Sequence, residues 1–165
     1  LTIQMLFNGK YIFSNYLPMS YLPIWILITT PLISIVLFLI GYIYLFKRLF
    51  NRLIRVDIDT NLNDLWRGKS EEMDFIIFLN FSLVFFYILF FSPVLYTGWR
   101  HLYFLHTFMT YACCIAVYII NVKFKNKILI FIIGLIILNN FYEIKKFHPY
   151  QSLYFNQLLQ KEKKN

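Results

Sequence analysis

The stretch IWILITTPLISIVLFLIGYIYLF, residues 24–46, is an apolar run without a charged residue. Its 23 residues would extend far enough as a helix, at about 1.5 Å per residue, to cross a hydrocarbon core of about 30 Å with some tilt. We therefore predict that residues 24–46 form a membrane-spanning helix.

Three further apolar stretches predict additional spans, at residues 75–92, 102–121 and 124–142. The last is long enough only if Lys125 and Lys127 extend to one membrane interface and Tyr142 anchors the other. The predicted fold class is an all-α membrane protein, a polytopic bundle of about four transmembrane helices plus interfacial helices. Residues 1–165 then form a single transmembrane domain.

The composition agrees with a membrane location. Apolar residues make up 59% of the chain and charged residues 15%, against about 45–50% and about 25% in soluble domains. The net charge of +8 comes from basic residues that lie between apolar runs. Membrane lipids are therefore the expected partner, and nucleic acid is not.

Residues 47–74 separate the first two spans. They begin with an amphipathic pattern, in which Leu49, Phe50, Leu53 and Ile54 recur at helical spacing among basic residues. Such a segment suits the headgroup layer of the membrane. A simple extension of the first helix with a solvated basic face is an equally good interpretation.

The distribution of lysine and arginine predicts the orientation of the spans. Residues 47–74 and 122–127 together carry nine basic residues, and the opposite side carries seven, three of them far from any span. The positive-inside rule therefore places these two connections in the cytoplasm. The N-terminal segment, the 93–100 loop and the tail at 143–165 are then extracytoplasmic.

The cysteines and histidines form no readable metal site, and any cofactor requirement stays unknown. Cys113 and Cys114 are adjacent within an apolar run, as expected of small packing residues. His101 and His106 are five residues apart, whereas two metal ligands on one helix prefer a spacing of four.

Candidate binding residues are found in the segment SPVLYTGWRHLYFLHTFMTY, residues 92–111. Arg100 lies where the third predicted span begins, and a guanidinium suits the phosphate of a lipid headgroup. The alternative is an interfacial anchor. Further along, a polar stripe at helical spacing is expected to face other helices rather than lipid. Its members are Tyr103, His106, Thr107 and Thr110, followed by Cys114 and Tyr118.

Two motifs resemble a known family. The sequence YTGWRHLYFL, followed by FHPYQSLYFN some forty residues later, resembles the C-terminal half of bacterial membrane glycosyltransferases of the GT-C superfamily. These are related to the dolichyl-phosphate-mannose protein mannosyltransferases and the lipid A aminoarabinose transferases. The upstream LPMSYLPIWILITTP is similar to the loop that leads into a late span of that family. The matching positions are Gly98, Arg100 and His101, then His148, Pro149, Tyr150 and Gln151.

The resemblance implies transfer of a sugar from a polyprenyl-phosphate donor to an extracytoplasmic acceptor, at the bacterial inner membrane. It implies substrate binding by Arg100, His101, Tyr96, His148 and Tyr150. The family carries a catalytic aspartate in its first extracytoplasmic loop, and this sequence contains no such loop. We therefore expect the chain to be part of a longer enzyme, with its catalytic residue unknown.

The alternative hypothesis is a non-enzymatic polytopic subunit or a lipid-handling transporter. The sequence indicates neither the sugar, the acceptor nor the oligomeric state.

Overall fold

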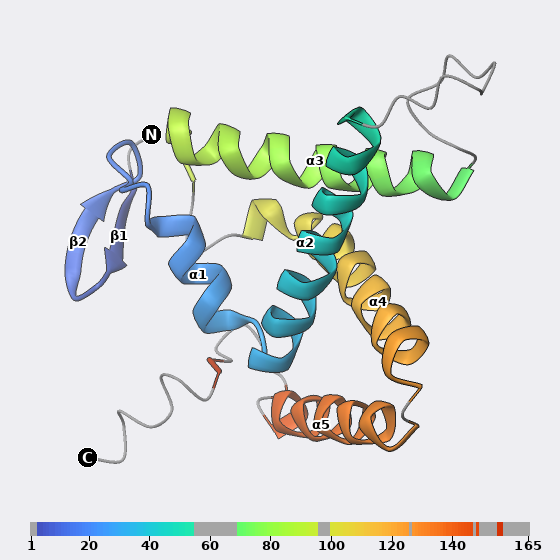
Figure 1. Ribbon diagram of the computed structural model, residues 1–165. Coiled ribbons are helices and arrows are strands. Elements are labelled where there is room, and N and C mark those ends of the chain that lie inside the picture. The colour runs from blue at the N-terminus through green and yellow to red at the C-terminus, as the bar shows by residue number, and fades with distance from the viewer. Residues whose placement is uncertain are drawn as a thin grey trace.

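The computed structural model describes residues 3–54, 69–95, 100–125, 127–146, 148 and 155–156, without the side chains of residues 52, 53, 69, 100 and 124. These residues form two strands, five α-helices and one short 3-10 helix (Figure 1). They are β1 (Gln4–Phe7), β2 (Lys10–Phe13), α1 (Tyr21–Thr29), α2 (Leu32–Ile54), α3 (Lys69–Phe91), η1 (Arg100–Leu102), α4 (Leu105–Phe124) and α5 (Lys127–Lys146).

The predicted fold class is confirmed. Helices α2 to α5 each contain a window long and apolar enough to cross a membrane: Leu32–Asn51, Ser70–Phe91, Leu105–Lys123 and Lys127–Lys146. The chain is therefore a helical, multi-pass membrane protein.

The first predicted span differs from the structure, because the helix breaks inside residues 24–46. Thr30 has extended dihedral angles (φ −96°, ψ 137°) and ends α1, and α2 begins at Leu32. Pro31 causes the break: it has no N–H to donate to the carbonyl of Leu27, and its ring disfavours a helical conformation at Thr30. The continuous span begins eight residues later than predicted and reaches Asn51.

The segment after the first span is a helical extension, one of the two interpretations of the sequence. Residues 47–54 continue α2 without a break. The rest of the predicted loop, at residues 55–68, lies outside the described residues. Helix α3 starts at Lys69, six residues before the predicted span. Glu71 and Glu72 lie in its first turn, where their negative charges interact favourably with the positive end of the helix dipole and stabilise the helix start.

The N-terminal segment contains a β-hairpin that the sequence interpretation did not include. Strands β1 and β2 pair antiparallel, with Phe7 opposite Lys10. Asn8 (φ 53°) and Gly9 (φ 76°) form the two-residue loop with positive φ at both positions, as a type I′ turn requires. The hairpin packs on α1, where the rings of Phe7 and Tyr21 lie 5.0 Å apart (Figure 1).

The most extensive helix contact joins α2 and α4. Gly41 of α2 lies directly against the backbone of α4, where any side chain would overlap the carbonyl group of Ala112. Small residues allow such close approach between spans, which gains packing where the hydrophobic effect between helices is absent. Leu45, Leu105, Met109 and Ala116 complete this buried contact.

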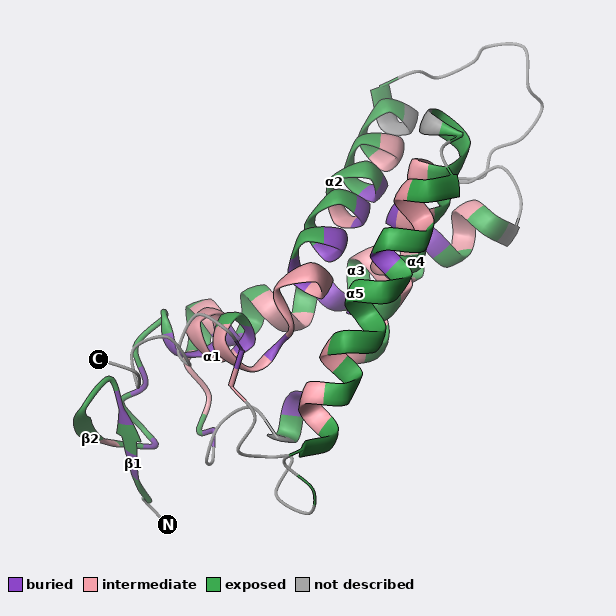
Figure 2. Cartoon of the chain, turned by 90° about the horizontal axis from the view of Figure 1, so that it is seen from below, coloured by how far each residue is buried: buried purple, intermediate pink, exposed green. Residues whose placement is uncertain are grey.

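Helix α5 makes few contacts with the other helices. Ile133 is its only buried residue, and large apolar side chains such as Phe131 and Phe141 are exposed. Figure 2 shows most of α5 in the colour of exposed residues. Exposed apolar surface of this kind is what a span presents to lipid.

Candidate functional site

The predicted substrate-binding residues are only partly described. Tyr96 and Tyr150 lie outside the described residues. Arg100 opens η1 with its backbone, and its side chain is among those not described. His101 is exposed in η1, and His148 is exposed just after α5, where its N–H donates to the carbonyl of Lys145 at 3.0 Å.

The predicted polar stripe on α4 is not the face that packs most tightly. The buried face is formed by Leu105, Met109, Ala112 and Ala116, at most 3% exposed. Tyr103, Thr107 and Thr110 are exposed, and His106 is half-buried. His106 and Thr110 line a space between α2, α4 and α5, and the expectation that the whole stripe faces other helices stays a prediction. The small alanines, rather than the polar side chains, allow α2 to approach α4.

Two of the stretches that carry the family resemblance, and the residues just before the remaining one, meet around α1. After α3, Pro93 and Leu95 line a small cavity together with Leu17, Pro18 and Leu22, which precede or begin α1. From the far end of the chain, the ring of Phe155 lies 6.3 Å from that of Trp25 on α1. Segments more than sixty residues apart in sequence thus contact the same helix.

Asn156 joins the C-terminal segment to the break between α1 and α2. Its side chain is buried and donates to the carbonyls of Leu27 and Thr30, the latter at 2.9 Å, while its backbone N–H donates to the carbonyl of Ile28 at 2.8 Å. A helix end leaves such carbonyls without intrahelical donors, and Pro31 removes the donor that Leu27 would have used. Asn156 therefore satisfies the acceptors that the proline leaves.

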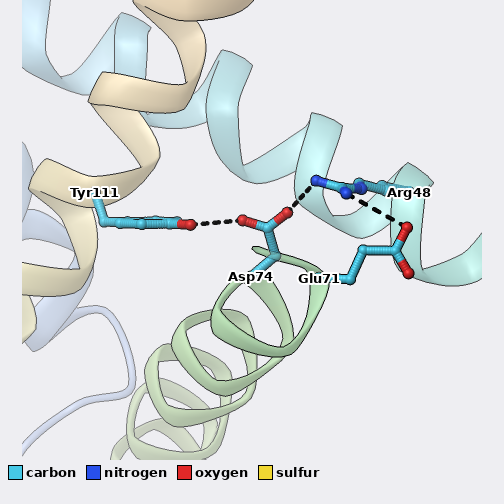
Figure 3. Close-up of polar contacts among 4 residues, drawn as sticks. All are labelled: Arg48, Glu71, Asp74 and Tyr111. Atoms are coloured by element: carbon cyan, nitrogen blue, oxygen red, sulfur yellow. Dashed lines mark hydrogen bonds and ion pairs between the residues drawn. The ribbon is translucent and has the colours of Figure 1, made fainter. Parts of the chain in front are cut away.

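A second polar site ties three spans together (Figure 3). Asp74 of α3 is 1% exposed and accepts hydrogen bonds from the guanidinium of Arg48 on α2 and from the hydroxyl of Tyr111 on α4, the latter at 2.7 Å. Arg48 also contacts Glu71 at 3.3 Å. Both carboxylate oxygens of Asp74 are thus paired, as a buried charge requires.

The geometry of this cluster indicates a structural role, because its contacts link α2, α3 and α4; we call it the Asp74 clamp. The side chain of Asp74 is 2% exposed, whereas that of Arg48 is 32% exposed. The sequence interpretation assigned no role to Arg48, Asp74 or Tyr111. The sequence shows that Arg48 and Asp74 carry opposite charges at the adjoining ends of two spans. It does not show the orientation of α4 about its axis, which brings Tyr111 to Asp74.

Among the described residues, no group of three histidine, cysteine, aspartate or glutamate side chains is placed to hold a metal ion. The chain matches no family model, no curated protein and no solved structure.

Proposed function

We propose that this chain is the C-terminal membrane part of a GT-C glycosyltransferase, which transfers a sugar from a polyprenyl-phosphate donor to an extracytoplasmic acceptor. Its compartment would be the bacterial inner membrane, with the active side outward.

The observation that carries the proposal is the convergence on α1. The resemblance rests on three separate stretches, LPMSYLPIWILITTP, YTGWRHLYFL and FHPYQSLYFN. Pro93 and Leu95, just before the second stretch, line a cavity with Pro18 and Leu22 of the first, and Asn156 of the third bonds to Leu27, Ile28 and Thr30. Stretches that serve one substrate must lie together. The third stretch contacts the first, and the residues just before the second lie beside the first, so this proximity supports a common site.

In this proposal Arg100 holds the phosphate of the donor. A guanidinium carries a permanent charge and two parallel N–H groups that match phosphate oxygens. A fixed cation also stabilises the negative charge that develops as the sugar leaves the phosphate. Tyr96, His101, His148 and Tyr150 would position the donor or the acceptor.

The experiment is sugar transfer by membranes that express the complete reading frame containing this chain, with a polyprenyl-phosphate sugar as donor. Arg100→Ala should lower transfer at least tenfold, and Arg100→Lys should retain part of it. Lys123→Ala, which removes a basic residue from the C-terminal end of α4, is the control and should transfer normally at equal expression. Undiminished transfer by Arg100→Ala would contradict the role of this arginine.

The alternative is a subunit or transporter that handles lipid without transferring sugar. The same membranes distinguish the two functions. Binding of the donor without any transfer, in the presence of extracytoplasmic acceptors from the same cells, would favour the alternative.

A further inference from the structure

A cavity of about 470 Å³ lies between α2, α4 and α5. Its walls come from the start of α2, from one side of α4 between His106 and Val117, and from Ile137 of α5. Figure 1 shows α4 diverging from α2 toward its C-terminal end, with α5 crossing below both. All three helices contain candidate spans, so the cavity lies at membrane depth.

The lining of the cavity is apolar over most of its surface. Leu37, Met109, Val117 and Ile137 contribute hydrocarbon, and Cys113 and Cys114 contribute weakly polar sulfur. Ser34, His106 and Thr110 add polar groups, but hydrocarbon forms most of the surface, which favours filling from the surrounding hydrocarbon phase.

The length of the cavity matches one leaflet. From His106 to Val117 the helix rises by about 16 Å, at about 1.5 Å per residue, which is close to half of a hydrocarbon core of about 30 Å. The volume equals that of roughly fifteen water-sized groups of about 30 Å³ each. A hydrocarbon chain from one leaflet has these dimensions.

Thr30 adds a polar group to the same cavity. It is 3% exposed, and its hydroxyl has no hydrogen-bond partner among the described residues. A buried hydroxyl without a partner costs about 1–3 kcal/mol, so a ligand oxygen that reached it would be held. Thr30 is also among the residues that line the cavity.

We propose that this cavity binds one acyl chain of a bilayer glycerophospholipid, with an ester oxygen of the lipid accepting a hydrogen bond from Thr30. Thr30 lies just before the first span, the depth at which ester groups occur, and this position favours a glycerophospholipid over a lipid without esters. The inference is independent of the proposed glycosyltransferase function.

The test is native mass spectrometry of the full chain in detergent, with dioleoylphosphatidylglycerol added to delipidated protein. Cys114→Phe, which fills the cavity, should lower lipid binding at least tenfold. Val122→Phe places the same side chain at an exposed position of α4 outside the cavity and should bind lipid normally. Equal binding by the two variants would overturn the proposal.

Thr30→Val tests the polar contact. It should lower phospholipid binding about fivefold, the effect of one lost hydrogen bond, without lowering the stability of the lipid-free protein. Thr29→Val is the control, because the Thr29 hydroxyl already donates to the carbonyl of Trp25 at 2.7 Å. Unchanged lipid binding by Thr30→Val would overturn the assigned contact. Displacement of the phospholipid by equimolar undecaprenyl phosphate would overturn the choice of a glycerophospholipid and assign the cavity to an isoprenoid chain.

Discussion

Asp74 is the one fully buried carboxylate among the described residues. It occupies the first turns of α3 and holds one partner from α2 and one from α4. A charge in this position is tolerated only while both partners remain, because removal of a partner leaves a buried polar group unsatisfied.

Replacement of Asp74 by alanine should destabilise the protein by about 1–3 kcal/mol, since Tyr111 loses its acceptor and Arg48 keeps only Glu71. The measurement is the free energy of unfolding in mixed micelles. Glu71→Ala is the control: it removes a longer contact at a partly exposed site and should cost less than about 1 kcal/mol. Equal losses of stability in the two variants would contradict the structural role of the Asp74 clamp.

Residue-scale features were the hardest to predict from this sequence. The sequence places Arg48 and Asp74 near the two ends of the segment that joins the first two spans, because each borders an apolar run. A contact between them could therefore be anticipated. Tyr111 and Asn156 were not, since each depends on a contact across a large sequence separation. Of the predicted binding residues, Tyr96 and Tyr150 lie outside the described residues, and the roles of all five stay predictions.

At the scale of elements, the closest packing depends on a single glycine. Gly41 has the backbone of Ala112 where its side chain would be, whereas Gly134 of α5 has no atom within 4 Å of the corresponding point. The two positions form a matched pair on spans of similar length.

Gly41→Ala should therefore separate α2 from α4 and destabilise the protein, by about 1–3 kcal/mol as for an overpacked core. Gly134→Ala should be neutral or stabilising by up to about 1 kcal/mol, because alanine is the better helix former. Thermal unfolding in detergent measures both. If Gly134→Ala proved the more damaging, α5 rather than α4 would be the partner that requires a small residue.

The junction between α1 and α2 offers a second test at this scale. Asn156→Ala removes the side-chain donors to Leu27 and Thr30, so amide hydrogen exchange in α1 should accelerate at least fivefold, as for a loss of about 1 kcal/mol. Asn139→Ala is the control, because Asn139 is exposed on α5. Unchanged exchange in α1 would mean that the C-terminal segment does not support the junction.

The elements differ in how far local sequence determined them. The apolar runs sufficed for the three later spans, because length and hydropathy are local properties. Pro31 was present within residues 24–46 and signalled the break in the first span, just as Asn8–Gly9 signalled the hairpin turn. In both cases the surrounding residues misled the interpretation. The apolar run around Pro31 suggested a continuous span, and the aromatic residues around Asn8–Gly9 suggested an interfacial segment without a hairpin.

At the scale of the whole molecule, the number of spans and the contacts of the chain ends agree. Four candidate spans among the described residues, each crossing the membrane once, would place the segments before α2 and after α5 on the same side. The hydrogen bonds from Asn156 to Leu27, Ile28 and Thr30 require the same arrangement. Which side this is follows only from the distribution of basic residues.

Cysteine labelling tests both points in a variant in which Cys113 and Cys114 are replaced by alanine. Tyr11→Cys in the exposed hairpin and His148→Cys after α5 should react with a membrane-impermeant maleimide in intact cells. Asn51→Cys lies near the C-terminal end of α2, and Lys125→Cys lies at the C-terminal end of α4. Both should react only after permeabilisation. If Tyr11 and His148 variants reacted from opposite sides, the four-span fold would be wrong. If both reacted only after permeabilisation, the fold would stand, and the proposed transfer on the outer side would fail because its binding residues would face the cytoplasm.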